Sequence, residues 1–131
     1  MIGDETYAIM TGNMDDGFQV ISLSDPTNPT PVASATDGAN GFDVLYSARK
    51  VHVFGGAPYA IVASSKDNGI ELIDLSNPAN PTPVASATDG DPGFESLTGA
   101  HGVDTFVIGG KTYAIISCYD PGNSIQVIEL V

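Results

Sequence analysis

Acidic residues in glycine-rich segments are the side chains best suited to chemistry in this chain. The stretch "TDGDPGFE" holds Asp89, Asp91 and Glu95, and the sister stretch "TDGANGFD" holds Asp37 and Asp43. Calcium takes about six to eight oxygen ligands from carboxylates and carbonyls, which such loops can offer. Asp-Gly pairs are also ordinary turn formers, and the spacing is not that of an EF-hand. Two interpretations follow: a calcium site formed from Asp37, Asp43, Asp89 and Asp91, or turns without a metal.

A histidine near these acids provides the second candidate site. His101 lies beside two glycines in "GAHGV", just before an expected strand that contains Asp104. If the fold brings both residues to the same end of the domain as Asp89, Asp91 and Glu95, they would form a ligand-binding site there. The alternative is a solvated loop histidine, with the acids again serving as turn residues.

Two other reactive residue types are expected to be structural. His52 lies in the strand-like stretch "VHVF" and, counted from the repeated tyrosines, aligns with Phe106. We therefore predict either a packing position or a channel-facing position for it. Cys118 is the only cysteine, so an intrachain disulfide is excluded. Its apolar surroundings in "YAIISCY" predict a small buried residue rather than a reactive thiol.

The sequence lacks the short motifs that are typical of zinc sites and of common enzyme classes. The chain contains no His-x-x-x-His or Cys-x-x-Cys spacing, so zinc is unsupported. It also contains no Gly-x-Ser-x-Gly elbow, Walker loop or Gly-x-Gly-x-x-Gly motif. We therefore expect a protein that is not an enzyme, with no catalytic residues and with calcium as the one cofactor to consider.

The excess of acidic residues limits the classes of partner that the chain is expected to bind. The 131 residues carry four Lys and Arg against sixteen Asp and Glu, a net charge of −12. Such a surface repels nucleic acid phosphates and anionic membranes. No apolar run approaches the roughly 18–20 residues of a membrane helix. We therefore expect neither nucleic acid binding nor membrane insertion. The 42% of hydrophobic residues is enough for a buried core.

An internal repeat dominates the chain. The stretch "NPTPVASATDG" occurs at Asn28–Gly38 and again at Asn80–Gly90. The stretches "TYAIMTG", "PYAIVAS" and "TYAIISC" form a matching triple around Tyr7, Tyr59 and Tyr113. A period of about 50 residues is typical of stacked or radial repeat arrays. We therefore predict one repeat domain over residues 1–131, with repeats at approximately 1–46, 47–98 and 99–131.

Each repeat divides into four short strands. The first, "VHVF" or "VDTFVI", is followed by a Gly-Gly turn at Gly55-Gly56 or Gly109-Gly110 and then by the Tyr-Ala-Ile strand. In the third strand, "IELIDL", Ile70 and Leu72 would share one face, and Glu71, Ile73 and Leu75 the other. A proline-rich connection leads to a small fourth strand, "PVASAT".

Four antiparallel strands at this period indicate an all-β fold of β-propeller blades. About ten strands are expected, grouped as three, four and three, or about two and a half repeats. Propellers close with about four to eight blades, so one chain would form an incomplete ring with uncovered blade faces. We expect either association with further copies of the chain or completion by missing blades of a longer chain.

The stretch "GIELIDLSNPANPTPVAS" resembles the LVIVD-type repeat, an apolar strand followed by Asn-Pro, a short gap, Pro and Val. The pattern covers Gly17–Ser34 and Gly69–Ser86, and a truncated copy begins at Ser124. The resemblance implies an extracellular or cell-surface binding or scaffolding module, although the start of the chain shows no signal peptide. We expect a protein or glycan partner. The alternatives are a calcium-stabilised adhesion or carbohydrate-binding module, or a hydrolase-type enzyme whose site at the propeller mouth would use His101 and Asp104 with Asp89 and Asp91. The chain has no Trp, so a glycan site would depend on Tyr46 and Tyr119.

The segments between repeats, "TDGANGFDVLYSARK" and "TDGDPGFESLTGAHG", are longer than in the family pattern. The distance from Leu97 to Tyr113 also exceeds that from Leu45 to Tyr59 by two residues. Insertions in repeat proteins map to loops, often on the binding face. We therefore expect the partner to meet these segments or the open blade edges.

Overall fold

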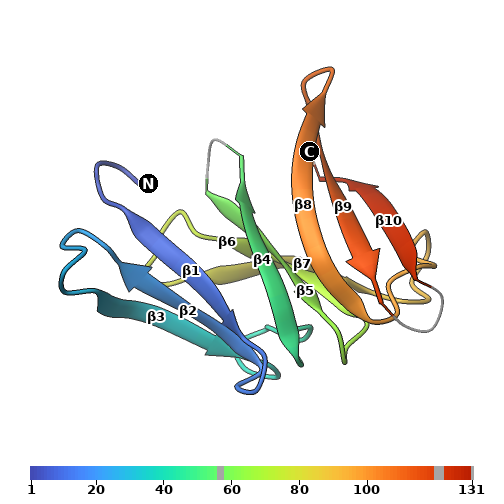
Figure 1. Ribbon diagram of the computed structural model, residues 1–131, viewed down its shortest axis with the longest axis horizontal. Helices are drawn as coiled ribbons and strands as arrows, with labels where there is room; N and C mark the ends of the chain where they lie inside the picture. Colours follow the sequence, from blue (N-terminus) through green and yellow to red (C-terminus); the bar gives the residue numbers. More distant parts are fainter. Residues whose placement is uncertain (56–57, 120–122, 131) are drawn as a thin grey trace.

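The computed structural model describes residues 1–55, 58–119 and 123–130 and contains ten strands in three antiparallel sheets (Figure 1). No helix occurs in these residues. The first sheet has the order β1-β2-β3, the second β4-β5-β6-β7 and the third β10-β9-β8. The predicted all-β fold and its three, four and three strands are confirmed. The strand bounds are β1 Tyr7–Gly12, β2 Gly17–Ser22, β3 Thr30–Thr36, β4 Ala48–Phe54, β5 Tyr59–Ser64, β6 Gly69–Asp74, β7 Thr82–Thr88, β8 Ala100–Ile108, β9 Lys111–Cys118 and β10 Ser124–Glu129.

The sheets lie side by side in chain order like sectors of a fan (Figure 1). We call them blades 1, 2 and 3. Strand β4 contacts β1 on one side and β8 on the other, so these three strands lie at the hub. Strands β3 and β7, which carry the repeated "PVASAT", are the outermost strands of blades 1 and 2. This arrangement is that of an incomplete propeller, with no closed barrel among the described strands.

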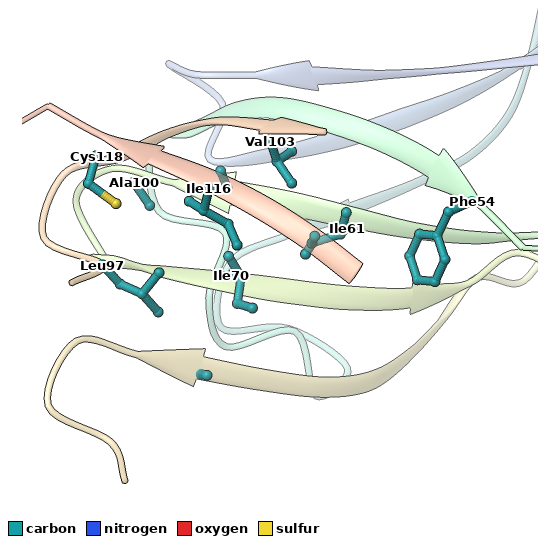
Figure 2. Packing of buried hydrophobic residues seen from close by; sticks show 11 residues of the cluster. Phe54, Ile61, Ile70, Leu97, Ala100, Val103, Ile116 and Cys118 are labelled. Atoms are coloured by element: carbon teal, nitrogen blue, oxygen red, sulfur yellow. The ribbon is translucent and has the colours of Figure 1, made fainter. Parts of the chain in front are cut away.

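A separate hydrophobic core fills each of the two blade junctions. Ile70 lies in the core between blades 2 and 3, and the half-buried Leu72 packs against the same core. Ile73 and Leu75 lie in the core between blades 1 and 2. The predicted alternation of faces along β6 is therefore confirmed. Figure 2 shows the junction of blades 2 and 3, where Ile70 lies near Ile116 of β9.

The connections between blades each contribute a leucine to these cores. We call residues 37–47 and 89–99 linkers 1 and 2. Leu45 in linker 1 and Leu97 in linker 2 are both fully buried, and their carbonyls accept the N–H of Ala48 and Ala100 at the start of the next blade. Each linker therefore places a large apolar side chain under the blade that it begins.

A close approach of the outermost strand requires glycine at the start of β2 and β6. A Cβ atom built on Gly17 would lie 2.0 Å from the Ala35 carbonyl oxygen, and one built on Gly69 would lie 2.4 Å from that of Ala87. Both carbonyls are backbone atoms that cannot turn away. In blade 3 the corresponding position, at the start of β10 and opposite the end of β9, is Ser124.

Strand pairing corrects one alignment. His52 pairs with Ile61, and Asp104 pairs with Ile115 at the same position of the next blade. The structural equivalent of His52 is therefore Asp104, and the predicted match to Phe106 is wrong. The two additional residues of blade 3 lengthen the β8–β9 hairpin at the end away from the linkers, beyond the pair formed by Phe106 and Tyr113. Of the two predicted Gly-Gly turns, Gly109-Gly110 forms, with φ of 59° and 78°, whereas Gly56 lies outside the described residues.

Candidate functional site

The repeated aspartates of the two linkers bind backbone. Asp37 Oδ1 accepts the N–H of Leu45 at 2.9 Å, and Asp89 Oδ1 accepts the N–H of Leu97 at 2.8 Å. Asp89 Oδ2 also accepts the hydroxyl of Thr98 at 2.9 Å. These bonds to the Leu97 N–H and the Thr98 hydroxyl lower the pKa of Asp89. Each aspartate therefore holds the linker in the conformation that buries its leucine.

The hairpins at the same end of the blades hold the linkers from the other side. Asp16 Oδ1 accepts the N–H of Ser47 at 2.8 Å, and Asn68 Oδ1 accepts the N–H of Gly99 at 2.9 Å. Asp67 Oδ2 accepts the N–H of a further linker residue, Tyr46, at 2.8 Å. Burial raises the pKa of Asp67, and the neighbouring Asp37 and Asp16 contribute to the shift. At this end of the blades, these side chains therefore hold each linker against the neighbouring hairpins by hydrogen bonds.

The remaining candidate metal ligands do not converge. Asp91 Oδ2 accepts the N–H of Thr88 at 2.8 Å within its own turn. Glu95 and Asp43 are exposed. Across the described ranges, no group of three or more His, Cys, Asp or Glu side chains is arranged to hold a metal ion. Calcium binding remains a prediction, without a preformed ligand set in these residues.

A linker aspartate can be tested by substitution. Replacing Asp89 with alanine leaves the Leu97 N–H without its acceptor and should lower the free energy of unfolding by about 1–2 kcal/mol. Glu95→Ala, which removes an exposed acid from the same linker, should change it by less than about 0.5 kcal/mol. Urea denaturation of both variants measures the difference. Equal effects would show that Asp89 does not tie the linker.

Glu71 is a buried carboxyl that we did not single out from the sequence. It is 1% exposed on β6, and its Oε2 accepts the N–H of Asp43 at 3.2 Å and of Val44 at 2.9 Å. Burial raises its pKa to about 7. The sequence contained a hint of this buried carboxyl, because a charged residue lies on the same strand face as Ile73 and Leu75, where apolar residues are expected.

The predicted grouping of His101 and Asp104 with the linker acids is not formed. Both residues are exposed on β8. Asp104 Oδ1 lies 3.4 Å from Nδ1 of His52 on the neighbouring strand β4. The described residues contain no hydrogen bond that joins Asp89 or Asp91 to His101 or Asp104. His101 instead lies beside Tyr119, with 6.2 Å between the ring centroids.

A hollow of about 340 Å³ lies between blades 2 and 3 at the linker end. Of the residues singled out from the sequence, His101 and Tyr119 line it. Arg49 also lines the hollow. We did not single it out from the sequence, although basic residues are rare in this acidic chain, with only four Lys and Arg. We call this hollow the linker-end hollow, and its lining residues are Arg49, Ser65, Asn68, Thr98, Gly99, His101 and Tyr119.

The two other residues singled out for chemistry also have structural surroundings. The buried Cys118 donates its S–H to the Ser96 carbonyl at 2.9 Å, and burial raises the pKa of the thiol. This agrees with the predicted structural role. Tyr46 is exposed, and Lys66 Nζ lies 4.8 Å from the centroid of its ring. Among the described residues, no helix has the length and apolar character to span a membrane.

Comparison with known proteins supports the interpretation of the repeat. No curated protein sequence matches the chain. The family model of the LVIVD repeat matches residues 47–89, which run from the end of linker 1 through all four strands of blade 2. The resemblance noted in the sequence is therefore confirmed for this segment, since residues 47–89 match the LVIVD repeat.

Proposed function

We propose that this chain is a non-enzymatic scaffold module that acts outside the cytoplasm and associates with other proteins through its terminal blades. The observation that carries the proposal is the pair of open blade faces. The extracellular placement rests on the resemblance to the LVIVD repeat. The net charge of −12 supports a protein partner over a nucleic acid or an anionic membrane.

The open face of blade 3 repeats the chemistry of a covered one. Ile125 and Val127 of β10 are 62% and 47% exposed. In blade 2 the equivalent side chains are Ile70, which is 1% exposed in the core next to blade 3, and Leu72, which packs against that core. Ile125 and Val127 are therefore apolar at positions that blade packing buries elsewhere in the same chain.

The open face of blade 1 has the complementary character. Met10 of β1 is 53% exposed. Met10 pairs with Gln19 just as Val62 pairs with Glu71 in blade 2, so Met10 and Val62 occupy equivalent positions. Val62 is fully buried against blade 1. The two open faces of the chain therefore correspond to the two sides of a blade junction.

A second copy of the chain is the partner that these faces fit. Blade 3 of one copy would pack against blade 1 of the next, as blade 2 packs against blade 3 within the chain. Such head-to-tail contacts form a ring when the rotation closes. Two copies supply six blades, within the range of about four to eight seen in propellers.

Light scattering on a sizing column tests the assembly. The chain should elute as a closed dimer or a small closed ring. Val127→Glu places a charge on the open face of blade 3, where the side chain is already half exposed, and should shift the protein to a monomer without loss of strand signal. Val84→Glu on the outermost strand of blade 2, where Val84 is 54% exposed, is the matched control and should retain the assembly.

Two outcomes would contradict the proposal. A wild-type chain that elutes as a monomer at high concentration would show that the faces do not pair. Equal masses for Val127→Glu and the wild type would show that any association uses another surface.

A further inference from the structure

We propose that the linker-end hollow binds an anionic group, such as a carboxylate or phosphate, on a small organic molecule. The hollow lies where the start of β4, the β5–β6 hairpin, linker 2 and the start of β8 meet. The described residues that line it all come from blades 2 and 3 and the linker between them. The proposed site therefore does not require a second copy of the chain.

The polar side chains of the hollow are mainly donors. Arg49 Nε donates to Ser65 Oγ at 3.1 Å, which orients the guanidinium. No acidic side chain in the described ranges forms an ion pair with Arg49, since the two ion pairs there are His52–Asp104 and Lys111–Glu129. The remaining guanidinium N–H groups form a planar fork that suits a carboxylate or phosphate.

A second donor comes from the β5–β6 hairpin. Asn68 Oδ1 accepts the N–H of Gly99, so its acceptor is occupied and its amide NH₂ group is left to donate. The Thr98 hydroxyl also lines the hollow but is used as a donor to Asp89 Oδ2. The bonds that tie linker 2 therefore also fix the wall of the hollow and leave N–H donors for a ligand.

Two rings form the remaining wall. The planes of His101 and Tyr119 are tilted by 38°, with their centroids 6.2 Å apart. A ring provides a flat apolar surface and, through the imidazole N–H or the phenol O–H, another donor. The combination favours an anionic group attached to a ring, such as a sugar acid, over a bare inorganic ion.

The local charge differs from that of the whole chain. Arg49 and Lys50 are two of only four basic residues, and both line an adjoining hollow that shares Arg49 and His101 with the first. At physiological salt, charges beyond about 8 Å are largely screened. The carboxylates of Asp67 and Asp89 keep their charge, but their hydrogen bonds to backbone N–H groups hold them against the linkers, and no described acid forms an ion pair with Arg49.

Calorimetric titration at 0.15 M salt tests the site, with inorganic phosphate, glucuronate and neutral glucose as the probes. Running it on the Val127→Glu variant separates the site from assembly. Glucuronate should bind more tightly than phosphate, and glucose should not bind. Arg49→Gln should weaken both anions about tenfold or more. Tyr119→Ala should weaken glucuronate more than phosphate. Lys111→Gln removes the same charge at the far end of β9 and should leave binding unchanged.

Other results would overturn the inference. If neither anion bound, the hollow would not be an anion site. If Lys111→Gln weakened binding as much as Arg49→Gln, the effect would be general charge rather than a site. Should Arg49→Gln fail to fold, Arg49→Lys replaces it, because it keeps the charge and removes the planar fork. Unchanged phosphate and glucuronate affinities in a folded Arg49→Lys variant would equally exclude the fork.

Discussion

Replacing Glu71 with glutamine should stabilise the protein above pH 7 and remove a pH dependence of stability that we expect for the wild type. Burial raises the pKa of Glu71 from 4.5 to about 7. Between these values the folded chain keeps a proton that the unfolded chain releases, so the stability of the wild type falls as the pH rises through this window. Below pH 4.5 both states are protonated, and Glu71 contributes no pH dependence there. Above about pH 7 the loss is complete and amounts to about 3 kcal/mol.

Glutamine is a suitable replacement because the repeat already uses it. Gln19 in β2 and Gln126 in β10 occupy the positions equivalent to Glu71. The amide oxygen of a glutamine can accept the N–H groups of Asp43 and Val44, which both bind one carboxylate oxygen. The variant therefore keeps the two bonds and loses only the ionisation.

Urea denaturation of both proteins at pH 4.5, 6 and 8 measures the effect. The other fifteen acids titrate in both proteins, so the informative quantity is the difference in unfolding free energy between them. We expect the advantage of the Glu71→Gln variant to grow with pH. A difference that stays constant from pH 4.5 to 8 would show that Glu71 ionises normally in the folded state.

Replacing Leu97 with alanine should cost about 2–5 kcal/mol of unfolding free energy. Leu97 is 0% exposed and packs between blades 2 and 3, where Figure 2 shows it near Ile70. Truncation removes apolar contacts and leaves a cavity in a core built from small and medium side chains. Because domains are stable by only about 5–15 kcal/mol, this variant should be close to unfolding at 37 °C.

The sister leucine provides a second measurement. Leu45→Ala should have a similar effect at the junction of blades 1 and 2, where Leu45 is also fully buried. The cores are separate, so the two losses should add. Val84→Ala, at an exposed position, is the control and should have little effect. A loss below about 1 kcal/mol for Leu97→Ala would contradict the role of the linker leucine.

The sequence was sufficient to locate the strands. Alternation with a period of two along "IELIDL" places Ile70 and Ile73 on opposite faces of the strand. Proline restricts a strand that contains it to the edge of a sheet, and Pro31 and Pro83 do lie in the outermost strands β3 and β7. The two faces and the outermost strands therefore follow from local chemistry. The same reasoning could not place the two additional residues of blade 3, because any position between Leu97 and Tyr113 satisfies the sequence. Strand pairing alone decides that they lengthen the β8–β9 hairpin.

The partners of the polar residues were also beyond sequence reasoning. Asn68 bonds to Gly99, 31 residues away, and an Asn in a tight turn looks the same with or without that bond. Arg49 follows Ala48 at the start of a strand, and only the approach of blade 3 places His101 and Tyr119 beside it. Local patterns give the type of each element, whereas a site depends on which elements meet.

Ser124 at the start of β10 restricts how a further strand can pair with the outer strand of blade 3. A strand that added to β10 in the register of β7 on β6 would bring a backbone carbonyl to the place where Gly69 leaves room, and there the Cβ of Ser124 would meet it. The edge therefore rejects a copy of the repeat's own outermost strand in that register. Unpaired edges are a common route to uncontrolled strand addition. One side chain thus disfavours the addition of a fourth strand to β10 in that register.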